Sequence, residues 1–340
     1  MKPTIYDVAK EAQVSIATVS KVINDTGRIS EKTRKRVLEA MEKLRYQPSV
    51  VASALTGKRT NTLGLLIPDL ANPFFAEVAR HVEDRGQEKG FNVIMCSTDY
   101  NPAKEAKYIS LLKQKQVDGI ILGSGFYNDQ MIAELQQENF PLVMISQEIP
   151  ALDIDTVSVD DFMGGYQVTQ YLLSLGHRRI GVIAESFQDN PANVRWSSKE
   201  RIRGYREALE AAGIGFDEDL VFISNSTIEA GKRVAGALLD AGPHPTAIFA
   251  LNDVLAIGTI KAVRERGLKI PEDIAIVGFD DTILATIVDP PLTTVAQPIR
   301  DMGYQAMDLL IEKIEGKENT TKRIILSPQL MIRQTTCPLT

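Results

Sequence analysis

Basic side chains are concentrated at the start of the sequence, and they are its clearest chemical signal. Residues 1–60 contain 12 Lys and Arg against 6 Asp and Glu, a net charge of +6, whereas the whole chain carries −6, which leaves −12 for residues 61–340. A basic module on an acidic body binds polyanions at one end and is repelled by them elsewhere. Nucleic acid is therefore the expected partner class.

Residues that could do catalysis are present, but they do not form a known catalytic pattern. The histidines His81, His177 and His244 are far apart, and the sequence contains no HExxH, GxSxG, Walker or GxGxxG motif. The sequence therefore lacks the motifs that zinc catalysis, nucleophilic catalysis and dinucleotide binding require. We expect a protein that is not an enzyme and that has no catalytic residue, no cofactor and no metal.

The sequence favours a cytoplasmic protein. Cys96 and Cys337 are too few and too far apart for a disulfide framework or a cysteine metal site, which fits a reducing compartment, and a disulfide between them is the less favoured alternative. Asp7 and Glu11 stand where a signal peptide needs a basic run followed by an apolar one. No apolar run approaches membrane-spanning length, so export and membrane insertion are both disfavoured.

Three short amphipathic helices are predicted in residues 4–46. Thr4 can cap the first, TIYDVAKEA, Ser15 the second, SIATVSKVIN, and Ser30 the third. The break of about three to four residues between the first two is the spacing of a helix-turn-helix, although a plain three-helix bundle has the same pattern. The stripe expected to be buried in the third helix consists of Val37, Leu38, Met41 and Leu44.

A further short helix is expected in QPSVVASALTGKRT, between Pro48 and Gly57. About seven residues are too few for a stable isolated helix, so it should become ordered on binding. Leu55 could cover a neighbouring apolar patch, or it could be an apolar wedge pushed between base pairs from the minor groove.

From Leu63 onward the pattern is that of an α/β body. Apolar runs alternate with amphipathic helical stretches from Thr62 to Asp281, which is long enough for two doubly wound units with right-handed crossovers. The predicted strands are TLGLLI, FNVIMC, DGIILG, PLVMIS, RRIGVIA, TAIFAL and IAIVGF. Ligands bind beyond the carboxyl ends of such strands, which points to DLANPFF, STD, ISQ, AES, LND and GFDD.

Nearly the whole chain resembles the lac repressor and galactose repressor family of bacterial transcription regulators. The likeness begins with TIYDVAKEAQVSIATVSKVIN and YQPSVVASALTGKRT. It continues in the same order through IPDLANPFFAEVARHVE, KQVDGIIL, LGHRRIGVI, PTAIFALNDVLAIG, IAIVGFDD and PPLTTVAQPI.

The resemblance implies an N-terminal all-α helix-turn-helix domain and hinge helix joined to a two-lobed, doubly wound α/β body of the type I periplasmic-binding-protein kind. We expect a DNA-binding domain at residues 1–46, a hinge helix and linker at 47–60, and an effector-binding and dimerisation domain at 61–340. Lobe one would comprise about 61–161 and 294–322, and lobe two about 162–293 and 323–340.

The resemblance also places the second helix against DNA. Ile16, Ala17 and Lys21 occupy positions that face base edges in the family; lysine can donate to guanine, whereas the other two offer only apolar contact, for example to a thymine methyl. Lys21 replaces a frequent family Arg and loses its bidentate fork. Leu55 matches the family's hinge leucine, which is inserted at the centre of a palindromic operator. The remaining DNA-contact candidates are Thr4, Tyr6, Ser15, Thr18, Ser20, Asn24 and Ser30.

The family's effector cleft supplies a second set of candidates. Aromatic rings can stack on sugars or bases, and short carboxylates and amides can hold hydroxyls, but core packing and helix capping explain the same residue types. Arg203 is the alternative to Arg201 if the register is shifted. Ser146 and Gln147 replace an Asp-Arg or similar pair of many members, so the effector stays open among a sugar, a sugar phosphate and a purine-like compound. The candidates are Phe74, Phe75, Arg201, Phe249, Asn252, Asp280 and Gln297.

These features predict a homodimeric, sequence-specific regulator of transcription, expected to be a repressor, that acts at the nucleoid and is controlled by a small molecule in the inter-lobe cleft. A catabolite-control regulator, whose input is a phosphorylated carrier protein bound outside the body, is the alternative within the family. A secreted solute-binding protein and an enzyme are the alternatives of other classes, disfavoured by the basic start and by the missing motifs.

Overall fold

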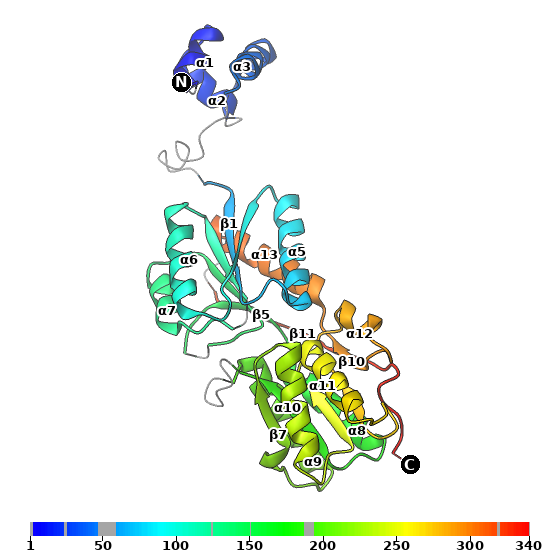
Figure 1. Ribbon diagram of the computed structural model, residues 1–340. Helices are drawn as coiled ribbons and strands as arrows, with labels where there is room; N and C mark the ends of the chain where they lie inside the picture. The colour runs from blue at the N-terminus through cyan, green and yellow to red at the C-terminus, as the bar shows by residue number, and fades with distance from the viewer. Residues whose placement is uncertain are drawn as a thin grey trace. The chain divides into compact units, whose positions relative to one another are not determined.

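A computed structural model describes residues 3–23, 26–46, 59–123, 125–149, 151–186, 194–317 and 320–339. The chain divides into two compact units, Met1–Thr60 and Asn61–Thr340 (Figure 1). None of the helices in the described ranges combines the length and the apolar character that crossing a bilayer requires. Asn24, Leu55 and the predicted hinge helix lie outside the described residues.

Capping side chains fix where the helices of the N-terminal unit begin. These helices are α1 (Ile5–Glu11), α2 (Ile16–Ile23) and α3 (Glu31–Leu44). The backbone N–H and the hydroxyl of Thr4 donate to the Asp7 carboxylate at 2.8 and 2.7 Å. Ser15 Oγ and Ser30 Oγ each accept from the backbone N–H three residues later, at 3.2 and 3.3 Å. Ser15 and Ser30 therefore accept backbone N–H groups that a helix cannot pair by itself, whereas at α1 the Asp7 carboxylate accepts from Thr4 instead.

One apolar face of each helix forms the core of this unit. Val8, Val19 and Val37 are fully buried in it. Leu38 was predicted in the buried stripe, but 51% of it is exposed. The buried positions of α3 repeat at residues 37, 40, 41 and 44, and consecutive residues of a helix lie about 100° apart, so residue 38 falls outside the stripe.

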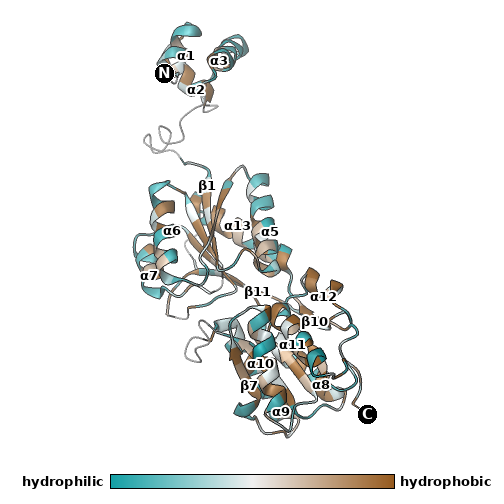
Figure 2. Cartoon of the chain, in the orientation of Figure 1, coloured by the Kyte–Doolittle hydropathy of each residue, from teal (hydrophilic) through white to brown (hydrophobic). Residues whose placement is uncertain are grey.

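Lobe one of the body is a parallel sheet covered by helices on both faces. Its elements are β1 (Thr62–Ile67), α5 (Pro73–Glu88), β2 (Asn92–Ser97), α6 (Pro102–Gln114), β3 (Gly119–Leu122), α7 (Asp129–Gln137), β4 (Leu142–Ile145), β5 (Asp155–Val159), α13 (Ile299–Glu315) and β11 (Arg323–Leu326). The strand order is β2-β1-β3-β4-β5-β11. Leu63 and Leu65 of β1 pack against α5 and α13, whereas Leu66 packs with α6 and α7. Figure 2 shows the strands largely hydrophobic and the outer sides of α5 and α6 hydrophilic, as a sheet buried on both faces requires.

Lobe two repeats the architecture with the strand order β7-β6-β8-β9. Its elements are α8 (Asp161–Ser174), β6 (Ile180–Glu185), α9 (Trp196–Ala211), η3 (Glu218–Leu220), β7 (Val221–Ser224), α10 (Ile228–Asp240), β8 (Ala247–Ala250), α11 (Asp253–Glu265), β9 (Ala275–Val277) and α12 (Ile283–Ile287). Ile183 faces α10 and α11, and its neighbour Val182 faces α8 and α9. The predicted doubly wound fold is thus confirmed in both lobes.

The described chain passes between the lobes at three points: from β5 to α8, from β10 (Thr294–Ala296) to α13, and from β11 to β12 (Gln329–Met331). The lobe boundaries expected near residues 294 and 323 differ by a few residues from the points where the described chain changes lobe. Strand β10 pairs with β12, and Val295 packs in the core of lobe two. Strand β11 pairs with β5, and Ile324 and Leu326 pack on the core of lobe one.

Two glycines allow α8 and α9 to touch along their backbones. A Cβ added at Gly204 would lie 2.1 Å from the carbonyl oxygen of Phe162, and one added at Gly165 would lie 2.2 Å from that of Arg201. Any larger residue would push the helices apart. At this distance Asp161 of α8 meets Arg201 of α9 at 2.8 Å.

Gly204→Ala should therefore lower the free energy of unfolding by about 1–3 kcal/mol, the usual cost of overpacking a core. Chemical denaturation followed by circular dichroism measures this. Gly215→Ala is the matched control, because a Cβ there meets nothing within 4 Å, and it should change stability by less than about 0.5 kcal/mol. Equal stability of both variants would contradict the close contact.

Candidate functional site

Helix α2 presents an outer face that mixes apolar and cationic groups. Ile16 is 39% exposed, and Ala17 and Lys21 are also exposed, while Val19 and Val22 on the opposite face are buried. The three exposed residues are those predicted to face base edges. Such a face can contact a thymine methyl through its apolar part and a guanine edge through the ammonium group.

The other predicted DNA contacts lie around the starts of the helices. Thr4 is exposed, but its hydroxyl is engaged by Asp7, and this hydrogen bonding holds the pKa of Asp7 below its usual value. Tyr6 is 68% exposed, which leaves its phenol accessible to a phosphate. Ser15 Oγ lies 2.9 Å from Thr18 Oγ1. Ser20 is half-buried and Ser30 is exposed.

Predicted effector residues gather around one cavity between the lobes of the body. Those that line it are Phe74, Phe75, Arg201, Asp280 and Gln297. Asn72, Ser146, Glu185, Arg195 and Ser197 complete the lining. Both lobes contribute, mainly from the carboxyl ends of strands and the turns that follow them, where ligands of α/β sheets bind.

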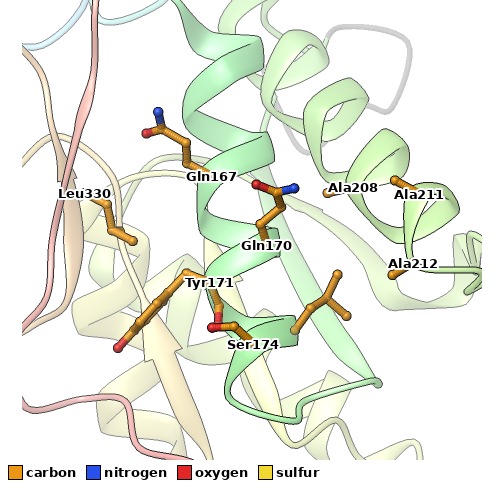
Figure 3. A pocket seen from close by; sticks show the side chains of 9 residues that line it. Gln167, Gln170, Tyr171, Ser174, Ala208, Ala211, Ala212 and Leu330 are labelled. Atoms are coloured by element: carbon orange, nitrogen blue, oxygen red, sulfur yellow. The ribbon is translucent and has the colours of Figure 1, made fainter.

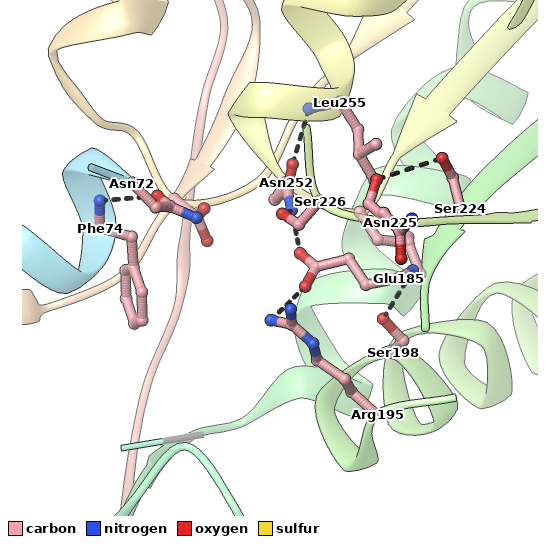
Figure 4. Close-up of polar contacts among 12 residues, drawn as sticks. Asn72, Phe74, Glu185, Arg195, Ser198, Ser224, Asn225, Ser226, Asn252 and Leu255 are labelled. Carbon is pink, nitrogen blue, oxygen red and sulfur yellow. Dashed lines mark hydrogen bonds and ion pairs between the residues drawn. The ribbon is translucent and has the colours of Figure 1, made fainter. Parts of the chain in front are cut away.

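The two phenylalanines form one wall from lobe one. Asn72 Oδ1 accepts from the N–H of Phe74 at 3.1 Å and so begins α5 (Figure 4). The rings of Phe74 and Phe75 pack edge to face with centroids 5.1 Å apart, and both also belong to the lobe-one core. A ligand would therefore meet aromatic edges that packing already holds in place.

Arg201 forms the floor of the cavity from lobe two. It donates to Asp161 at 2.8 Å and to the carbonyl of Leu251, and its guanidinium lies 3.5 Å from the centroid of the Phe279 ring. Arg203, the alternative in sequence, is exposed and pairs with Glu200. Of these two alternatives, Arg201 is the buried residue that lines the cavity.

Asp280 and Gln297 meet at the base of the cavity. Gln297 Nε2 donates to Asp280 Oδ1 at 2.7 Å. Asp280 has φ of +118°, a strained value for a residue with a side chain, and such strain is concentrated at functional sites. Burial raises the pKa of Asp280 well above its usual value, although the charge of Arg201 acts in the opposite direction. Among the described residues, Gln297 Oε1 and Ser146 Oγ are buried without hydrogen-bond partners, so a polar ligand would satisfy them.

Glu185 and Arg195 were not predicted as site residues, yet Glu185 is the centre of the polar network in Figure 4 and Arg195 is bound to it. Glu185, the last residue of β6, pairs with Arg195 and accepts from Asn252 Nδ2. Asn252 also donates to Ser226 Oγ at 2.6 Å. The position of Glu185 at the end of a strand, in AES, was a usable signal in the sequence. No sequence signal marks Arg195, because its role depends on a partner that is distant in sequence.

Two predicted effector residues do not line the cavity. Phe249 is fully buried in the lobe-two core with Val182, Val168 and Tyr205, because its side chain points to the face of the sheet that α8 and α9 cover. Asn252 lies behind the cavity wall, where its Oδ1 accepts from Leu255 N–H at 2.7 Å and caps α11. Its amide orients Glu185 instead of facing the cavity.

A second concavity of about 700 Å³ lies on the outside of lobe two (Figure 3). It is formed by α8, α9 and Leu330, and it has glutamine, serine and alanine side chains but no charged ones in its lining. It contains none of the predicted site residues. Within the described ranges, no group of His, Cys, Asp or Glu side chains is arranged to hold a metal ion.

Comparison with known proteins accounts for both units. Residues 4–49 match the family model for bacterial regulatory proteins of the lacI family. Residues 169–336 match the family model for a periplasmic binding protein-like domain. The HTH-type transcriptional regulator DegA of Bacillus subtilis (strain 168) is 50% identical over 342 residues, which cover 100% of this chain and 99% of DegA.

Solved structures agree with this relationship over the full length. The lac repressor dimer bound to operator and the anti-inducer ONPF superposes with a TM-score of 0.86 at 27% identity and covers 99% of this chain and 100% of its own. The complex of the transcriptional regulator CelR with cellobiose has a TM-score of 0.75 at 33% identity and covers 98% and 99%. The chain therefore belongs to the lacI family of bacterial regulatory proteins and is a DNA-binding regulator of transcription, not an enzyme.

Proposed function

We propose that this regulator binds a palindromic operator as a homodimer through α2, and that a small molecule bound between the lobes of the body changes its affinity for that operator. The effector can act only by binding two conformations of the body with different affinities. Such a regulator works where bacterial DNA is, in the cytoplasm at the nucleoid.

The exposed face of α2 supports the assignment of base contacts. Ile16, Ala17 and Lys21 are accessible together on one side of a helix whose other side is buried. Tyr6, Ser15 and Ser30 supply phosphate contacts nearby, and Leu55, outside the described residues, remains the proposed wedge at the operator centre.

The single observation that carries the effector proposal is the convergence of Phe74, Arg201, Asp280 and Gln297 on one cavity built by both lobes. A molecule held from both sides changes the free energy of lobe closure. Polar groups and aromatic edges in one wall suit a sugar, and the similar regulator CelR was solved with cellobiose.

Helix α12 supports self-association. Ile283 and Ile287 stand four residues apart on the same side of the helix and are 58% and 68% exposed. Apolar side chains that lie together on a surface mark contact sites when they form a contiguous patch. The similar lac repressor was solved as a dimer on its operator, and a second copy of this chain is the partner that we assign to α12.

Lys21→Ala should weaken operator binding about 10-fold and reduce the preference for guanine at one position of each half-site, because it removes a base-edge donor. Selection of bound DNA from a random pool, followed by fluorescence anisotropy on single-base variants, measures both effects. Lys43→Ala is the control: Lys43 pairs with Glu11 at 2.6 Å, and its loss should leave the base preference unchanged. An unaltered preference in Lys21→Ala would rule out the base contact.

Asp280→Asn should lower the affinity for the effector at least about 10-fold, because the amide replaces one carboxyl oxygen with an NH2 group and so leaves an effector hydroxyl without its acceptor. A thermal-shift panel of sugars, sugar phosphates and purines identifies the effector, and calorimetry then compares the variants. Asp219→Asn, at an exposed position, should bind like the parent. A panel without any shift would contradict the small-molecule proposal and would favour a phosphorylated carrier protein as the input.

A further inference from the structure

The space between the lobes is divided into two chambers that share Arg195. The inner chamber is the cavity of Asp280 and Arg201, and it leaves a free volume of only about 20 Å³. The outer chamber measures about 510 Å³, which lies within the usual range of small-molecule sites. The open space of the cleft is therefore found beside the predicted effector residues and not among them.

Both lobes line the outer chamber with polar groups. Lobe one supplies Asp69, Asp99 and Tyr100, and lobe two supplies Ser186, Arg195 and Ser226. The guanidinium of Arg195 lies 4.4 Å from the centroid of the Tyr100 ring, so this contact bridges the lobes at the boundary between the chambers. A ligand in the outer chamber would touch both lobes, as one in the inner chamber would.

Unused hydrogen-bonding capacity points into this region. Ser186 is only 2% exposed, and its Oγ has no hydrogen-bond partner among the described residues. The Nε of Arg195 is likewise buried without an acceptor in the described part of the chain. Buried polar groups are rarely left unsatisfied unless a ligand or water completes them. A ligand hydroxyl would satisfy Ser186 Oγ, and a ligand acceptor oxygen would satisfy the Nε of Arg195.

The charges of the chamber disfavour an anion. Arg195 is already neutralised by Glu185, and Lys104 beside the chamber is bound to Asp99. Asp69 adds a further carboxylate, whose Oδ1 accepts from the backbone N–H of Ala71 at 2.8 Å. Among the described lining residues Arg195 is the only cation, and it is paired, so a phosphate or carboxylate would meet these negative groups without compensation, whereas neutral hydroxyls can donate to carboxylate oxygens.

We propose that the outer chamber is a second subsite, which binds the outer ring of a neutral effector made of two linked sugar rings, while Asp280, Gln297 and Arg201 hold the inner ring. This inference rests on the proposed effector site and adds the length and the charge of the effector. The inner ring requires the tightly closed inner chamber to widen, and the linkage between the rings passes Arg195.

Calorimetry with matched pairs of ligands tests the subsite: glucose against cellobiose, maltose and trehalose, xylose against xylobiose, and galactose against lactose, with glucose 6-phosphate as the anionic probe. We expect one disaccharide to bind at least about 10-fold more tightly than either of its component sugars, and glucose 6-phosphate to bind no better than glucose. Equal affinity for disaccharide and monosaccharide, or preference for the phosphate, would overturn the subsite.

Two conservative variants separate this inference from the proposed function. Ser186→Ala and Asp69→Asn should each remove most of the disaccharide advantage and leave monosaccharide affinity unchanged, whereas Asp280→Asn should weaken both ligands. Ser174→Ala, in the outer groove of Figure 3, is the matched control and should change neither. Binding of the disaccharide by Ser186→Ala and Asp69→Asn with parental affinity would refute the subsite alone. No binding of any sugar would refute both the subsite and the sugar effector.

Discussion

The backbone contact between α8 and α9 is the constraint on which the cleft depends. With no Cβ at Gly165 or Gly204, the helices approach closely enough for Asp161 to reach Arg201. That ion pair is buried, and a buried charge is stable only when its partner and remaining donors are satisfied. The carbonyl of Leu251 and the face of Phe279 complete this environment. A wider helix spacing would leave the guanidinium unpaired and the cavity without a floor.

The rest of the cleft follows the same rule of matched buried charges. Glu185 balances Arg195, and Asn252 fixes the other carboxylate oxygen of Glu185 while it caps α11. Side chains held in this way lose little entropy when a ligand arrives, so the polar groups are already oriented for binding even though the inner chamber must widen to admit a ring. Atoms left without partners, such as Ser146 Oγ, are the places where a ligand replaces water most favourably.

Sequence patterns predicted much of the fold, because strands buried on both faces are continuous apolar runs. Strand β5, DTVSV, escaped prediction because it alternates polar with apolar residues. Strand β7, VFIS, also escaped prediction, although it is as apolar as strands that were predicted. The end of a predicted strand suggested Asp280, and the resemblance to the family suggested Gln297; both line the cavity. Phe249 was assigned to the cleft wrongly, because a strand turns successive side chains to opposite faces and only the packing shows which face is covered. Arg195 depends on contacts with Tyr100 and Glu185, which no local pattern encodes.

The passages between the lobes are short, and two of them contain proline. One consists of Gln297 and Pro298 between β10 and α13, and another of Ser327 and Pro328 between β11 and β12. Proline fixes one backbone torsion in each connector. A connector restricted in this way passes a rotation of one lobe on to the other. Gln297 faces the cleft and also belongs to a connector. A ligand that contacts Gln297 therefore acts directly on the segment that joins the lobes. The effector would therefore contact a connector about which the lobes rotate. A small rotation at that connector moves the far ends of both lobes by a larger distance.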